Sequence, residues 1–267
     1  MVPSITIGQF FPGNSPVHRV DPRMKIVLAA LYITAVLIVK GFLGYAFIAA
    51  AFVIIAALSQ IRLQYLLKGL KPIIFIAAFT FVLNVFFTQG EELLFSVWRI
   101  KVYKEGILNA AFFALRLVFL VLGTSILTLT TSPMALTDAL ERLLKPLKAI
   151  KFPVHELSMM MTIAMRMIPT IMEETDKIMK AQTARGADFE SGKLLSRAKA
   201  MIPLLVPLFV SAFRRADELS MAMESRCYRG DINRSRMKVL HLGRIDFYAL
   251  GLMALMTALV VLEKWLI

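Results

Sequence analysis

The chain has 267 residues, of which 58% are hydrophobic and only 18% charged, and 31 lysines and arginines against 18 acidic residues give a formal net charge of +13. Soluble domains average about 45–50% apolar and 25% charged residues, so the composition excludes a disordered chain and an ordinary soluble domain. Strong positive charge is typical of proteins that contact nucleic acid or an anionic membrane face, and a mean hydropathy of +0.70 favours the membrane and its lipid over nucleic acid.

Five apolar runs predict membrane-spanning helices, because a charge at the bilayer centre is costly. The first, Ile26 to Val39, has 14 residues, which is short for a span of about 20 residues, but its flanking lysines can reach the interfaces. The first 23 residues lack the apolar stretch of a signal peptide. We therefore expect an all-α polytopic membrane protein with about five transmembrane helices. The other four runs are 41–61, 72–90, 107–131 and 247–262.

Basic residues are distributed unequally between the two sides that these spans define. With a cytoplasmic N-terminus, the inner segments hold 25 lysines and arginines and the outer segments hold 5. Positive charge favours the cytoplasmic side, so the distribution predicts a multi-pass protein of the cell membrane with its N-terminus inside. The chain then divides into an N-terminal membrane domain with four spans (1–130), cytoplasmic helices (131–245) and a C-terminal transmembrane helix (246–267).

The cytoplasmic segment has helical periodicity throughout. Ser132 and Pro133 are typical of a helix start, and an amphipathic helix along the membrane surface is expected after them. Two long amphipathic helices follow, over about 155–185 and about 203–226. In the first, Pro169 should cause a bend. In the second, Arg214 and Glu218 have the spacing of an ion pair.

A methionine stripe runs along the first long helix. Methionines at helical spacing most often fill a core, and they also form adaptable surfaces that repack against different partners; we give the two interpretations equal weight. The stripe contains Met161, Met165, Met172 and Met179.

Each long helix ends in an arginine beside a turn-prone sequence, Ala184-Arg185-Gly186 and Ser225-Arg226-Cys227. One such arginine is explained by the helix dipole, which is worth about 0.3–1 kcal/mol for a cation in the last turn. Two of them, 41 residues apart in one cytoplasmic block, suggest docking points, since arginine binds carboxylates in a bidentate manner.

Catalytic motifs are missing from the sequence. It contains no Gly-x-Ser-x-Gly and no His-Glu-x-x-His, and segment 191–194 resembles a phosphate-binding loop only at its tail. The three scattered histidines argue against a metal site. Arg116 is the one ionisable residue inside a predicted span; it is a functional candidate or, equally, a packing residue that binds backbone carbonyls or an acidic side chain.

Across nearly its whole length, the chain resembles the transmembrane T subunit of energy-coupling factor transporters. The resemblance rests on segment 14–25, on Thr131-Ser132-Pro133 and on segment 165–169. It is strongest at the two helix ends, where Ala184-Arg185-Gly186 matches fully and Ser225-Arg226-Cys227 keeps only the arginine. Together these motifs are specific, and each alone would be weak.

The resemblance implies a coupling subunit that is not an enzyme and holds no metal or cofactor. In this family, two ABC-type ATPase subunits bind the ATP, and the helix-end signatures sit in grooves on them. Their closure moves the coupling helices, and the motion passes to a substrate-binding S subunit, dedicated or exchangeable, that releases a vitamin or metal ion inward. Arg185 and Arg226 would then contact the ATPases, and the methionine stripe would contact the S subunit.

The alternative is a self-sufficient secondary transporter or channel. Such carriers have broken spans, polar residues at mid-membrane depth and paired repeats, of which the sequence shows little. The sequence does not name the transported substrate.

Overall fold

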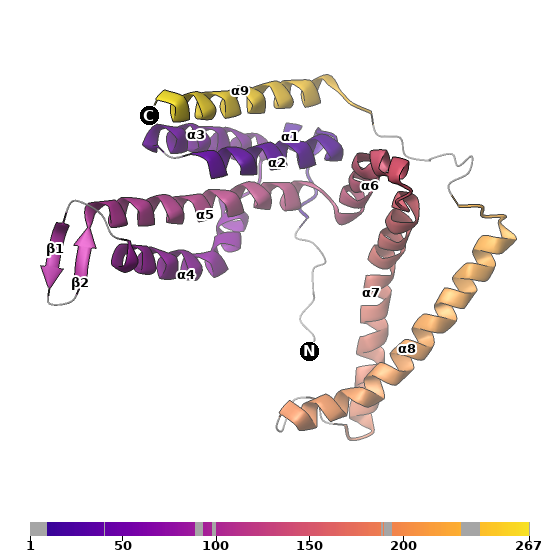
Figure 1. Cartoon of the computed structure of the whole chain (residues 1–267). Coiled ribbons are helices and arrows are strands. Elements are labelled where there is room, and N and C mark those ends of the chain that lie inside the picture. The colour runs from indigo at the N-terminus through magenta and orange to yellow at the C-terminus, as the bar shows by residue number, and fades with distance from the viewer. Residues whose placement is uncertain are drawn as a thin grey trace. The chain divides into compact units, whose positions relative to one another are not determined.

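The computed structural model describes residues 10–39, 41–88, 93–97, 100–187, 189, 194–230 and 241–266; segment 191–193 lies outside them. Helices make up most of this part of the chain, and a short hairpin joins α4 to α5 (Figure 1). The elements are α1 (Pro16–Arg19), α2 (Pro22–Ile38), α3 (Phe42–Ser59), α4 (Leu63–Phe87), β1 (Leu93–Val97), β2 (Ile100–Tyr103), α5 (Lys104–Thr130), α6 (Pro133–Leu144), η1 (Lys145–Ile150), α7 (Val154–Ala184), α8 (Leu194–Ser225) and α9 (Arg244–Leu266).

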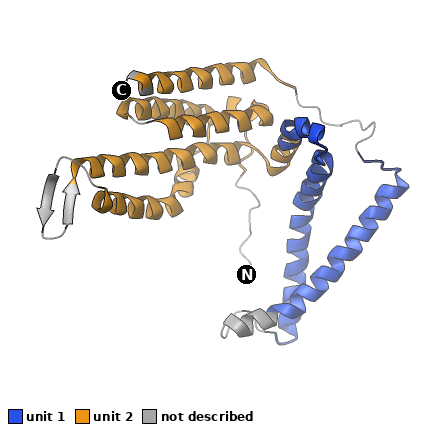
Figure 2. Cartoon of the chain, in the orientation of Figure 1, with its two compact units in different colours: residues 1–6, 140–238 blue, residues 7–139, 239–267 orange. Residues whose placement is uncertain are grey.

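The chain forms two compact units (Figure 2). The membrane unit contains Ile7–Ala139 and Val239–Ile267, and the second unit, called here the long-helix unit, is built on Leu140–Lys238. Each unit has contacts of its own, so each is described separately below.

Four helices of the membrane unit, α3, α4, α5 and α9, are long and apolar enough to cross a bilayer. They confirm the expected all-α polytopic class. α2 has 17 residues, which is at the lower end of the roughly 17–25 residues of a transmembrane helix, so α2 can be the fifth span that the sequence predicted.

Three spanning helices, α4, α5 and α9, begin earlier than the apolar runs predicted. α4 begins at Leu63 and includes Lys68, Lys71 and Pro72, whereas the apolar run starts at position 72. α5 begins at Lys104, three residues before its run. A charge limits how deep a residue can lie in the bilayer, but it does not interrupt the i to i−4 hydrogen bonds of a helix. Charge boundaries therefore predict the apolar length of a span and underestimate the helix.

α5 is central to the membrane unit, where it packs against α2, α3 and α4, and α9 packs against α2 and α3. Two hydroxyl groups fasten these helices: the Tyr32 hydroxyl donates to the Phe119 carbonyl at 3.0 Å, and the Tyr45 hydroxyl donates to the Phe112 carbonyl at 3.1 Å. At Gly123 a Cβ atom would collide with the Tyr32 ring. Glycine is therefore what allows α5 to approach α2 this closely.

The long-helix unit consists chiefly of two long helices, α7 and α8. α6, which leads into it, begins as the sequence predicted, because the Ser132 hydroxyl accepts a hydrogen bond from the Ala135 amide at 3.3 Å. α7 and α8 have 31 and 32 residues. α8 begins at Leu194, nine residues before the expected start at Pro203, and it runs through two prolines.

Candidate functional site

The first candidate site is the C-terminus of α7. Ala184 is the last helical residue, Arg185 is the C-cap, and Gly186 follows with a φ of +88°. The Gly186 amide donates to the Thr183 carbonyl at 2.9 Å, and the Ala187 amide donates to the Gln182 carbonyl at 3.0 Å. These two bonds define a Schellman motif, in which a residue of positive φ ends the helix.

The C-terminus of α8 has the same arrangement. Arg226 follows the last helical residue, and Cys227 has a φ of +55°. The Cys227 amide donates to the Glu224 carbonyl at 2.8 Å, and the Tyr228 amide donates to the Met223 carbonyl at 3.0 Å. Both long helices thus end in a Schellman motif with arginine at the C-cap.

This repetition revises the comparison of the two signatures. In sequence, Ser225-Arg226-Cys227 retains only the arginine of Ala184-Arg185-Gly186. In the structure, Cys227 adopts the left-handed conformation of Gly186, so the backbone geometry is kept as well. Arg185 and Arg226 are both exposed, and each guanidinium belongs to a residue at the negative end of a helix dipole.

A buried histidine holds the segment that follows Arg226. His155, at the start of α7, is 4% exposed. Its Nδ1 lies 3.2 Å from Glu141 Oε1, and its Nε2 lies 3.2 Å from the Tyr228 hydroxyl. Ser158 donates to the other oxygen of Glu141 at 3.1 Å. Sequence reasoning missed this cluster, since His155 and Tyr228 are 73 positions apart.

A second polar contact joins α7 to α8. Glu174 on α7 accepts hydrogen bonds from Arg215, at 3.1 Å, and from Ser211, both on α8. This link was also missed, because neither helix alone shows which of its charges face the other. The pair that sequence spacing did predict, Arg214 with Glu218, is present at 3.2 Å on the exposed side of α8.

The methionine stripe of α7 is half-buried at all four positions, Met161, Met165, Met172 and Met179. A more exposed apolar stripe lies on α8, and its helical spacing could have been found in the sequence. Its most exposed residue, Phe213, is 70% exposed. The α8 stripe contains Ile202, Val206, Phe209 and Phe213.

Arg116 binds a backbone carbonyl inside the membrane unit. Its Nη2 donates to the Val39 carbonyl at 2.9 Å, just beyond the end of α2, and its guanidinium lies 5.5 Å from the Phe113 ring centre. The packing interpretation of Arg116 therefore has direct geometric support. Two acidic residues of α9, Asp246 and Glu263, are buried near the ends of that helix, outside the apolar run from which the span was predicted.

Within the described residues, no three histidine, cysteine or acidic side chains are grouped so as to hold a metal ion. What the long-helix unit offers is a pair of exposed arginines with matching backbone geometry. Such a pair suits recognition of acidic surfaces on another protein.

Comparison with known proteins identifies the family. The CbiQ family, described as "Cobalt transport protein", matches residues 13–239. A protein of Clostridium kluyveri is 54% identical over 250 residues, covering 93% of both chains. One of Thermosediminibacter oceani is 53% identical over 253 residues, covering 94% of this chain and 95% of its own. One of Bacillus subtilis is 47% identical over 240 residues, covering 90% and 91%.

All three relatives are named "Energy-coupling factor transporter transmembrane protein EcfT". The matches extend over both units, including the helix ends that suggested the resemblance. The chain is a multi-pass membrane protein, and it belongs to the EcfT family of transmembrane components of energy-coupling factor transporters.

Proposed function

We propose that this chain is the non-catalytic coupling subunit of an ATP-driven importer. It passes the motion of two ABC-type ATPase subunits to a membrane-embedded, substrate-binding S subunit for uptake of a vitamin or other micronutrient. ATP is bound by the ATPases, so the chain itself needs no cofactor. The observation that supports the proposal most strongly is that α7 and α8 both end in an exposed C-cap arginine followed by a residue of positive φ.

The helix ends suit a contact that transmits force. Arg185 and Arg226 each offer a planar, permanently charged group that can bind a carboxylate in a bidentate manner. A helix transmits displacement along its axis because its hydrogen bonds run parallel to that axis. The Glu174 contacts with Arg215 and Ser211 join α7 to α8. A displacement of one helix is therefore transmitted to the other.

The S subunit would contact apolar surface of the same two helices. The α7 methionines are one part of that platform, and their half-buried positions leave limited area for a partner. The α8 stripe offers more, with Phe209 at 61% and Phe213 at 70% exposed. Methionine and aromatic side chains are enriched where proteins associate, and an adaptable surface would serve either a dedicated or an exchangeable S subunit.

The proposed orientation follows from charge. With α2 counted as the first of five spans, a cytoplasmic N-terminus puts 25 of the 31 basic residues on the inner side, as the preference of positive charge for the cytoplasmic side requires. In that orientation Arg185 and Arg226 face the cytoplasm, where the ATPases have access to ATP. The cell membrane is the corresponding location.

Charge reversal at the helix ends tests the ATPase contact. Arg185→Glu and Arg226→Glu should each weaken co-purification of the ATPases and reduce substrate uptake by the complete transporter, since breaking a desolvated charge pair costs about 2–5 kcal/mol. Arg214→Glu is the matched control, because Arg214 is an exposed arginine of α8 whose recorded partner is Glu218 on the same helix. Full ATPase recovery and normal uptake in both variants would contradict the proposal, as would solute flux through the purified chain alone.

The S-subunit surface needs a separate test. Met172→Ser and Met179→Ser, and in parallel Phe209→Ser and Phe213→Ser, should reduce recovery of the S subunit more than recovery of the ATPases. Serine removes the apolar contact area without adding charge. If these variants lost the ATPases and kept the S subunit, the faces would be assigned the wrong way round.

A further inference from the structure

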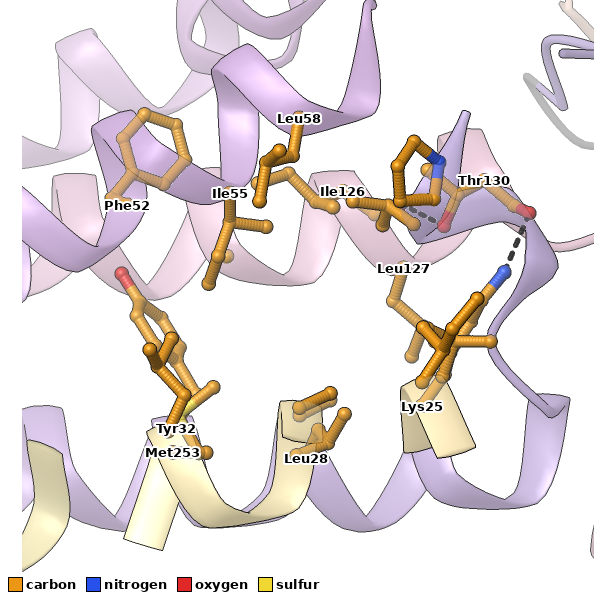
Figure 3. Close-up of a pocket in the computed structure, with 18 of the residues that line it drawn as sticks. Lys25, Leu28, Tyr32, Phe52, Ile55, Leu58, Ile126, Leu127, Thr130 and Met253 are labelled. Atoms are coloured by element: carbon orange, nitrogen blue, oxygen red, sulfur yellow. Dashed lines mark hydrogen bonds between the residues drawn. The ribbon is translucent and has the colours of Figure 1, made fainter. Parts of the chain in front are cut away.

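An apolar cavity of about 320 Å³ lies inside the membrane unit (Figure 3). This volume is at the lower end of the roughly 300–1,000 Å³ of small-molecule pockets. Its walls come from α1, α2, α3, α5 and α9, and Figure 3 shows Leu28 and Tyr32 on one side of the space and Ile55 and Ile126 on the other. Neither the ATPase contact nor the S-subunit contact makes use of it.

The polar groups in the walls are bonded to the protein itself. Lys25 Nζ donates to the Thr130 carbonyl at 3.0 Å and to Thr131 Oγ1 and the His18 carbonyl, both at 3.3 Å. The Tyr32 hydroxyl donates to the Phe119 carbonyl, and the Thr130 hydroxyl donates to the Ile126 carbonyl at 2.8 Å.

Lys25 lies in the first turn of α2, before the apolar run. Its ammonium group has three N–H donors, and the three recorded bonds use all of them. The cavity walls therefore present apolar surface to a ligand. A polar ligand would lose its hydrogen bonds to water and gain none from the protein.

The rim of the cavity is apolar and exposed. Leu58 on α3 is 49% exposed, Leu252 on α9 is 50% exposed, and Tyr248 is 76% exposed. α3 and α9 are both spanning helices, so these side chains meet the bilayer. A hydrocarbon chain can enter from the lipid without passing through water. A second helix, which is about 10 Å wide, would not fit a cavity of this size.

Two basic residues are sequence neighbours of residues that line the cavity. Arg19 stands between the lining residues Val17 and Val20, and Arg244 directly precedes the lining residue Ile245. Both arginines are exposed. Phosphate oxygens are bound well by guanidinium groups, so the charge complements an anionic headgroup attached to an apolar tail.

We propose that this cavity binds one acyl chain of an anionic glycerophospholipid whose phosphate contacts Arg19 and Arg244. The acyl chain fills the space between α2, α3, α5 and α9, and the headgroup stays at the interface. The bound lipid thereby packs between helices that otherwise enclose a void, which raises the stability of the membrane unit as binding to the folded state alone requires.

Photo-crosslinking tests the acyl-chain site. The purified full chain is reconstituted in phosphatidylcholine vesicles that contain a small proportion of phosphatidylglycerol with a diazirine on its acyl chain. Labelling should be concentrated on the cavity-lining parts of α2 and α9. Equal labelling of the exposed apolar face of α4, which includes Phe75 and Phe79, would show only general lipid contact and would overturn the proposal.

Matched alanine substitutions locate the site further. Ala29→Phe and Ala249→Phe place a ring in the cavity and should abolish the concentrated labelling. Ala30→Phe and Ala254→Phe are the controls, since these alanines are exposed on the same two helices and do not line the cavity. Concentrated labelling that survives both cavity substitutions, in chains that still purify and fold, would also overturn the proposal. The labelling map of the unaltered chain decides the matter if the phenylalanine variants do not fold.

The headgroup contact is tested by competition. Unlabelled phosphatidylglycerol should displace the crosslinking lipid more effectively than phosphatidylcholine does. Arg19→Gln or Arg244→Gln should each reduce that preference about fivefold, as expected for one basic residue at an anionic lipid. A preference unchanged in the double variant would refute the assignment of these arginines. The assay contains neither ATPase nor S subunit, so its result is independent of the proposed coupling function.

Discussion

Gly186 and Cys227 hold the same position in two copies of one helix-ending motif. Each follows a C-cap arginine, each has a positive φ, +88° and +55°, and each donates its amide to the carbonyl three residues earlier. The chain therefore leaves α7 and α8 by the same local path. The two arginines start from equivalent backbone positions, as expected if the proposed ATPase partners are a pair of similar subunits.

Gly186→Ala should destabilise the end of α7. A Cβ at this position meets nothing within 4 Å, so the cost comes from the left-handed backbone alone and amounts to about 1–2 kcal/mol. Thermal unfolding of the purified chain and ATPase capture should both decline modestly. An unchanged melting temperature would show that the end of α7 does not contribute to the cooperative unit.

Cys227→Gly should have the opposite effect. Glycine adopts the left-handed backbone conformation without the steric strain that a side chain causes there. The greater freedom of glycine in the unfolded chain offsets part of this gain, so the folded state should be stabilised by about 0.5–1 kcal/mol. Because Arg226 is retained, ATPase capture should stay normal. Cys227→Val is the comparison variant, since β-branching worsens the strain. Loss of capture in the glycine variant would mean that the thiol itself takes part in docking.

Tyr228→Phe should loosen the segment after Arg226. The change removes the hydroxyl that lies 3.2 Å from His155 Nε2 and 3.0 Å from Met159 Sδ. Loss of one hydrogen bond at a buried group costs about 1–3 kcal/mol. The expected results are a lower melting temperature and weaker ATPase recovery.

Met159→Leu is the control for the tyrosine variant, because it removes only the sulfur acceptor and keeps the apolar volume. It should have a smaller effect on both measurements. If the two variants behaved alike, the His155 contact would not be what positions this segment.

The Glu174–Arg215 contact should couple α7 to α8 more strongly than an ordinary surface pair. A double-mutant cycle with Glu174→Gln and Arg215→Met should give an interaction energy of about 1 kcal/mol. The same cycle on the exposed Arg214–Glu218 pair should give about 0.3–0.5 kcal/mol, as is typical of i,i+4 pairs in water.

Substrate uptake is the second measurement for this pair. Breaking the link between the helices should lower uptake even when ATPase binding is normal, because the motion is then no longer shared. Equal coupling energies for the two pairs, with uptake unaffected, would argue against the proposal that α7 and α8 move together.

Several features could be predicted from local sequence because they depend on neighbouring residues. Apolar runs identified α3, α4, α5 and α9, since length and hydropathy decide whether a helix can cross a bilayer. The start of α6 followed from Ser132 and Pro133, and the Arg214–Glu218 pair followed from its spacing. The arginine signatures were recognised by their resemblance to a known family.

Helix ends were predicted less well, and for a physical reason. Charged residues limited the apolar runs, whereas α4 and α8 continue for about nine residues beyond them. α2 shows the same effect, because it begins at Pro22, four residues before its apolar run.

The sequence by itself determined the membrane class, the basic charge and the two helix-terminal arginines. Only the tertiary structure decided that Cys227 has the backbone of Gly186, that Tyr228 reaches His155, and that Lys25 meets Thr130 across 105 positions to close one end of an apolar cavity. Periodicity and composition describe which side of a helix is apolar. They do not state which distant residue lies against it, because that depends on how the whole chain packs.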